Sequence, residues 1–154
     1  MSPPTVLAVA LDGALCDTRR MWDDWLESTA AVLGIDPGEL PEDRGGAAAE
    51  LDRRGAGNWR TLLGRWAEER APVYVRRDAG TSRALRALGG AGARVGVFTD
   101  APEELARVAL AQLGLDRRIA ALETGASARE RLLAQLGPDT AVVETRDRLL
   151  ELAP

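Results

Sequence analysis

The sequence predicts an α/β protein with a doubly wound, Rossmann-like parallel sheet of about four to five strands. Four short apolar runs rich in β-branched residues predict strands at Thr5–Leu11, Arg94–Thr99, Ile119–Glu123 and Thr140–Thr145. Each run is nearly continuous in its hydrophobicity, which is typical of strands covered on both faces in a parallel sheet. Helical patterns lie between and after these runs, and this alternation favours right-handed crossover connections.

Two of the expected helices have recognisable boundaries. Asp100 with Glu103, and Ser127 with Glu130, have the spacing of capping pairs before apolar residues that recur at helical intervals. Gly114 follows the last apolar residue of the first of these helices, where a glycine commonly ends a helix. We therefore expect one helix after the second strand and another after the third.

Residues 19–75 differ from the rest of the chain because they contain no strand pattern. They hold all four tryptophans: Trp22, Trp25, Trp59 and Trp66. These lie in two amphipathic helical patterns, the first ending at Gly34 and the second beginning after Asn58, and the two helices should pack on each other. Residues 36–57, rich in Pro, Gly and Ala, predict a looser connection. The sequence thus predicts a small helical subdomain at 19–75, inserted into a core formed by 1–18 and 76–154.

The tryptophans allow two interpretations. In the first, they form the core between the two helices and the sheet. In the second, some rings are exposed and anchor a protein partner or a second copy of the chain, because aromatic side chains are favoured at interfaces. The sequence leaves both open.

Composition excludes several classes of function. The net charge of −4 lacks the basic excess of a nucleic-acid-binding protein. There is no run long enough to span a membrane and no signal-peptide pattern, so we expect a cytoplasmic protein. The absence of histidine excludes serine triads, cysteine–histidine dyads and histidine-based metal sites. Any chemistry must come from carboxylates, hydroxyls, arginine or a metal held by oxygen.

The first predicted strand runs into a short polar loop that resembles the first motif of the haloacid-dehalogenase-like (HAD) hydrolase superfamily, D-x-D-G-T-L-x-D-T. The residues that match are Asp12, Gly13, Leu15, Asp17 and Thr18. In that family the first Asp attacks phosphorus, and here Ala10 stands at its position. The second Asp is the general acid and base, which the resemblance assigns to Asp12. A helical cap sits at the same point in the chain as residues 19–75.

The resemblance extends to the last helix, but the other three motifs match weakly. It implies that Thr99 binds a phosphoryl oxygen. The third motif requires a lysine, of which the chain has none, and Arg129 is the nearest cation. The fourth motif requires two acids for magnesium, and Glu144 matches the first while Arg148 stands at the second. We therefore expect no cofactor, or at most weakly bound Mg²⁺.

These losses predict a HAD-like pseudoenzyme that has lost phosphatase activity and acts as a binding, regulatory or assembly module. The alternative is a divergent enzyme, either a hydrolase or an isomerase or lyase. It would act on a small phosphorylated or carboxylated metabolite, with Asp12 as acid and base. The sequence names neither a ligand nor a partner, and it does not fix the oligomeric state.

Overall fold

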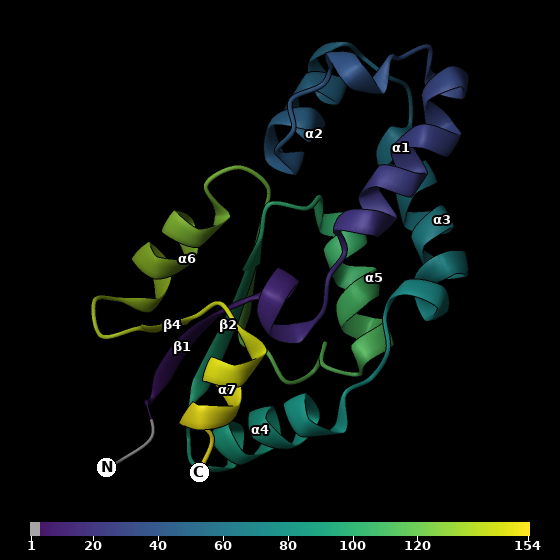
Figure 1. Cartoon of the computed structure of the whole chain (residues 1–154). Coiled ribbons are helices and arrows are strands. Elements are labelled where there is room, and N and C mark those ends of the chain that lie inside the picture. Colours follow the sequence, from purple (N-terminus) through teal and green to yellow (C-terminus); the bar gives the residue numbers. More distant parts are fainter. Residues whose placement is uncertain (1–3) are drawn as a thin grey trace.

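A four-stranded parallel sheet forms the centre of the computed structural model, which describes residues 4–154 (Figure 1). The strands are β1 (Val6–Ala10), β2 (Arg94–Thr99), β3 (Ala121–Thr124) and β4 (Ala141–Val143), in the order β3-β2-β1-β4. All three pairings are parallel. The predicted α/β fold is confirmed, and each predicted strand is present with ends shifted by no more than two residues.

Helices cover both sides of this sheet, with α5 (Glu103–Leu113) and α6 (Ala128–Leu136) on opposite sides (Figure 1). Burial on both faces explains the continuous apolar run of β1, in which Leu7, Ala8 and Val9 are all fully buried. Helices α4 (Ala79–Gly90) and α7 (Arg146–Leu152) complete the core. None of the helices in the described chain is long and apolar enough to cross a membrane.

Three helices, α1 (Arg19–Leu33), α2 (Arg44–Arg53) and α3 (Trp59–Tyr74), follow β1 and lie to one side of the sheet (Figure 1). We call them the helical insert. Helix α1 ends, as predicted, at Gly34, whose φ of 69° is the left-handed conformation that glycine adopts without strain. The insert rests on the core through α3, which packs along α5. The assignment of 19–75 as a separate subdomain stays a prediction.

The expectation of a loose connection at 36–57 was wrong, because this stretch contains α2 and a short 3-10 turn at Pro37–Glu39. Asp43 caps α2 by accepting a hydrogen bond from the Gly46 backbone N–H at 2.7 Å. Small apolar residues then give the helix a buried face that includes Ala47 and Leu51. Because alanine and glycine are abundant in this stretch, the buried face gives only a weak helical pattern in the sequence.

Three of the four tryptophans form a cluster in the core of the insert. Trp22, Trp25 and Trp59 are only 3%, 1% and 2% exposed, and their ring centroids lie 5.3–6.4 Å apart. The core interpretation is confirmed for these three residues. Trp66 is partly exposed and packs against Tyr74 at 5.8 Å. The rings that could anchor a partner are therefore mostly unavailable.

Both predicted capping pairs were wrong. Ser127 precedes α6 in a left-handed conformation, with φ 58°, and its side chain makes no capping hydrogen bond. The residue before α5 is Pro102, which has no side chain capable of capping. Asp100 is not used as a cap and instead contacts α2, as described below. Long-range contacts thus override the local spacing at both helices.

A tight turn, η1 (Leu11–Leu15), connects β1 to the insert and depends on glycine at position 13. Gly13 has φ 103°, and a Cβ atom there would lie 2.6 Å from the carbonyl oxygen of Glu144. The backbone of the turn closes through a hydrogen bond from the Gly13 N–H to the Cys16 carbonyl oxygen at 2.9 Å. The first site residue, Asp12, lies within this turn.

We predict that Gly13→Ala lowers the free energy of unfolding by at least about 2 kcal/mol. Alanine is strained at this positive φ, and its Cβ would also clash with the carbonyl oxygen of Glu144. Gly34→Ala is the matched control, because Gly34 also has positive φ but a Cβ there meets nothing within 4 Å. It should cost only about 1 kcal/mol. Urea denaturation measures both, and equal losses would contradict the role given to the clash.

Candidate functional site

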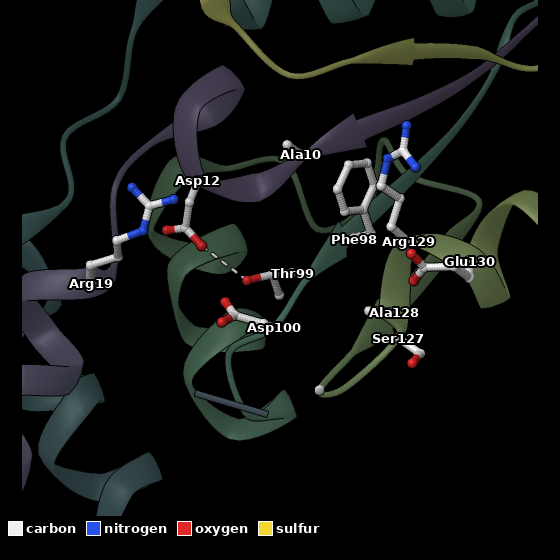
Figure 2. Close-up of a pocket in the computed structure, with 11 residues that line it drawn as sticks. Ala10, Asp12, Arg19, Phe98, Thr99, Asp100, Ser127, Ala128, Arg129 and Glu130 are labelled. Atoms are coloured by element: carbon white, nitrogen blue, oxygen red, sulfur yellow. Dashed lines mark hydrogen bonds between the residues drawn. The ribbon is translucent and has the colours of Figure 1, made fainter. Parts of the chain in front are cut away.

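The site residues meet at the carboxyl ends of β1 and β2, where open parallel sheets generally place their sites. Asp12 follows β1 and Thr99 ends β2. The Thr99 hydroxyl donates a hydrogen bond to Asp12 Oδ2 at 3.0 Å, and the two side chains point toward each other (Figure 2). Beside them is an open cleft of about 280 Å³, whose wall includes Ala10 and Arg129. The structure thus brings Ala10, Asp12, Thr99 and Arg129 to one cleft.

Thr18, at the start of α1, fixes the other oxygen of Asp12. Its backbone N–H and its hydroxyl both donate to Asp12 Oδ1, at 2.6 and 2.7 Å. Thr18 is fully buried, so these bonds are shielded from water. Asp12 is therefore held in one orientation from both sides.

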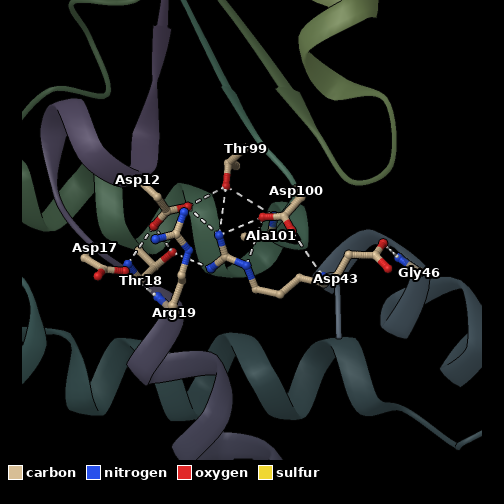
Figure 3. A network of polar contacts seen from close by, with 10 residues as sticks. Asp12, Asp17, Thr18, Arg19, Asp43, Gly46, Thr99, Asp100 and Ala101 are labelled. Carbon is tan, nitrogen blue, oxygen red and sulfur yellow. Dashed lines mark hydrogen bonds and ion pairs between the residues drawn. The ribbon is translucent and has the colours of Figure 1, made fainter. Parts of the chain in front are cut away.

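Arg44, the first residue of α2, reaches from the insert into this site, and it is only 4% exposed. Its guanidinium donates to Asp12 Oδ2, to Asp100 Oδ1 at 2.8 and 3.0 Å, and to the Thr18 hydroxyl at 2.7 Å. Figure 3 shows the acceptors Asp12, Thr18, Thr99 and Asp100 gathered around one point. We call this set the Arg44 network.

The backbone of α2 also approaches the core closely. The Arg44 N–H donates to Asp100 Oδ2 at 3.2 Å. A Cβ atom on Gly45 would lie 2.5 Å from the backbone nitrogen of Ala126, in the loop before α6. The insert thus contacts the loops at the carboxyl ends of both β2 and β3.

Charge pairing sets the protonation of the network. Burial alone would raise the pKa of Asp12, but the charge of Arg44 and the Thr18 hydrogen bonds outweigh it and lower that pKa below its usual value. Burial alone would likewise lower the pKa of Arg44, and the neighbouring Asp12 and Asp100 raise it instead. Both partners are therefore ionised at neutral pH.

The neighbouring thiol of Cys16 is unsuited to nucleophilic chemistry. Burial, together with the charges of Asp12 and Asp17, raises the pKa of Cys16 to about 12. Since the thiolate is the reactive form, Cys16 is a packing residue at neutral pH.

Arg129 lines the cleft but makes no contact with Asp12, and Glu144 and Arg148 do not line the cleft. Arg129 faces Glu144, with 3.6 Å between its Nε and a carboxylate oxygen, and both side chains are largely exposed. Arg148 pairs with Glu151 on the same helix. Glu144 instead contributes its backbone carbonyl to the packing of Gly13.

These residues do not fit a magnesium ion, which the HAD resemblance would imply. Both oxygens of Asp12 already accept hydrogen bonds, and the cation among the carboxylates is a guanidinium. Ala10 offers no ligand atom, and Glu144 is not among the residues that line the cleft. Within residues 4–154, no group of three or more Cys, Asp or Glu side chains is placed to hold a metal.

Sequence reasoning missed the two most heavily engaged charges of the site, Arg44 and Asp100. Arg44 lies 56 residues from Asp100 and 32 from Asp12, so no local spacing connects them. The chain contains no lysine, and Arg44 is one of 20 arginines. The position of Asp100 just before a helix predicts a local capping role, and nothing in the sequence indicates its contact with Arg44.

Comparisons with known proteins find likeness only among solved structures. No family model matches the chain, and no curated protein sequence matches it. Among solved structures, the chain is similar to a hydrolase from Streptococcus pneumoniae TIGR4. The identity is 15% and the TM-score 0.42, with 84% of this chain and 70% of that chain covered. A likeness of this degree carries no conclusion about activity.

We predict that Arg44→Ala lowers the free energy of unfolding by about 3 kcal/mol, because it leaves the buried Asp12 carboxylate without its partner. Arg107→Ala is the matched control, since Arg107 makes an exposed pair with Glu103 one helical turn away. It should cost about 0.5 kcal/mol. Chemical denaturation measures both variants.

The double variant Asp12→Asn/Arg44→Met separates two contributions to the stability loss of Arg44→Ala. One is the loss of the Arg44 contacts, and the other is the cost of burying the Asp12 charge without a partner. The double variant should be more stable than Arg44→Ala, because no ionised group is left buried without a partner. Equal stability of Arg44→Ala and Arg107→Ala would contradict a structural role for the network.

Stability should also depend on pH through Asp12. Because the pKa of Asp12 in the folded protein lies below its usual value, the stabilisation is complete above about pH 5 and is lost as the pH falls through the folded pKa. In Asp12→Asn this decline should be shallower, by up to about 1.4 kcal/mol per pH unit below pH 4. Urea titrations at pH 2–6 test this, and parallel curves would contradict the lowered pKa.

Proposed function

We propose that this chain is a HAD-like protein without phosphatase activity that acts as a binding, regulatory or assembly module. The observation that supports this most directly is the Arg44 network. A side chain of the protein itself binds the carboxylate on which the family's acid–base chemistry depends. An internal arginine is thus fixed where a catalytic site would need a free acid.

The chemistry of each missing or engaged group supports the same proposal. Covalent phosphoryl transfer requires a nucleophile, and the methyl group of Ala10 cannot attack phosphorus. A general acid must carry a proton near the working pH, whereas the lowered pKa of Asp12 keeps it ionised. The cationic clamp on a phosphoryl group is also weakened, since Arg129 lies beside Glu144.

The alternative, a divergent enzyme that uses Asp12 as its base, conflicts with the same contacts. A base needs a lone pair directed toward substrate, while the oxygens of Asp12 face Thr18, Thr99 and Arg44. Nothing among the described residues favours this alternative. The phosphate-release assay below distinguishes it from the proposal.

We predict that the purified chain does not hydrolyse p-nitrophenyl phosphate or a panel of sugar and nucleotide phosphates with millimolar MgCl₂. Ala10→Asp should stay inactive, because Arg44 still occupies Asp12 and no lysine is present. Release of inorganic phosphate above a no-protein control is the measurement.

Asp12→Asn is the control that assigns any activity to this site. Phosphate release by the wild-type chain that Asp12→Asn abolishes would overturn the proposal and support the divergent enzyme. A melting temperature raised by millimolar MgCl₂ in the wild-type chain, but not in Asp12→Asn, would contradict the conclusion that the site does not fit the ion.

A further inference from the structure

A second hollow lies on the insert, away from the cleft, between α1 and residues 35–42. It has a volume of about 880 Å³. Its accessible apolar surface comes from Leu26 and Ala31 on α1 and from Ile35, Pro37 and Pro41 opposite, and the buried side chains of Trp22 and Leu40 lie beneath them. We call it the acidic groove, because all the charged side chains along it are carboxylates.

Four acids line this groove: Asp23, Glu27, Asp36 and Glu42. All four residues are exposed, and none has an arginine within salt-bridge distance among residues 4–154. No basic side chain lines the groove, although the chain has 20 arginines. The groove therefore combines an apolar surface with four exposed carboxylates that form no salt bridge among the described residues.

Three of the four acids lie toward the ends of the groove, and Glu27 lies between them, one helical turn after Asp23 on α1. Asp23 and Glu42 also line a small recess at the start of α1, together with Arg19 and Arg44. Asp36 lies just beyond the other end of the helix. The stretch of α1 between Asp23 and Ala31 is about 12 Å long at 1.5 Å per residue. An extended chain of about four residues covers that length.

We propose that the acidic groove binds a polypeptide segment of a partner protein in which about four apolar residues lie between two arginines or lysines. The apolar side chains of the peptide cover Leu26 and Ile35. One cation meets Asp23 and Glu42, the other meets Asp36, and Glu27 adds negative charge between them. A small organic cation with one charge neutralises only one end, so the spacing favours a peptide. This inference rests on the proposed function, since it names the partner chemistry of a binding module.

The test uses a fluorescein-labelled hexapeptide with four leucine or alanine residues between two arginines. Fluorescence anisotropy should show saturable binding to the full chain, weakened at least threefold when NaCl is raised from 50 to 300 mM. The same hexapeptide with glutamate in place of arginine should not bind. Backbone amide NMR shifts on peptide addition should concentrate at residues 22–31 and 35–42.

Glu27→Lys should weaken binding at least fivefold, because it places a cation in the groove. Glu69→Lys is the matched control, an equal charge change at an exposed acid of α3 outside the groove, and it should change the affinity less than twofold. Absence of binding to the wild-type chain at millimolar concentration overturns the inference. Equal weakening by both variants also overturns it, because binding would then follow net charge alone.

Phosphate release is measured in the same samples, which keeps the two proposals distinguishable. Peptide binding by a chain that hydrolyses phosphate esters through Asp12 overturns the proposed loss of activity and leaves the groove standing. If the chain neither hydrolyses phosphate esters nor binds the peptide, only the inference about the acidic groove is overturned.

Discussion

The pairing of Arg44 with Asp12 and Asp100 is the contact on which the arrangement of insert and sheet depends. It joins the first residue of α2 to the carboxyl ends of β1 and β2. The Arg44–Asp12 pair is buried, whereas the Asp100 side chain is 47% exposed. A buried ion pair adds little net stability over an apolar contact of the same shape, but each charge requires the other. This pairing fixes the insert beside the carboxyl ends of the strands. It also engages Asp12, the acid of the cleft, in a structural contact.

The strands and their order along the chain could be predicted because a strand that is buried on both faces has a continuous run of apolar residues. Leu7, Ala8 and Val9 read as a continuous apolar run, and they are fully buried in β1. The ends of α1 and α5 could be predicted for a similar reason, since Gly34 and Gly114 adopt the left-handed backbone conformation that glycine favours. These features depend on neighbours in the sequence.

The candidate site could be predicted only where a motif placed its residues. Asp12 and Thr99 lie at the ends of adjacent strands, so their contact follows from the topology. Arg44 could not be found in this way, because its partners come from segments 26 to 56 residues distant. The apolar face of α2 consists largely of alanine, whose small side chains give a weak periodic signal. Ser127 failed as a cap because its backbone follows the turn after β3.

The close approach of Gly45 to Ala126 has a consequence for how this protein can vary. Any side chain at position 45 would act as a wedge between α2 and the loop before α6, since even its first carbon would meet backbone atoms on the other side. Backbone atoms cannot rotate away as a flexible side chain can, so the wedge would have to tilt the whole of α2. The adjacent guanidinium would then be withdrawn from its acceptors. The contact between α2 and the loop before α6 therefore depends as much on the missing Cβ atom of Gly45 as on any charge.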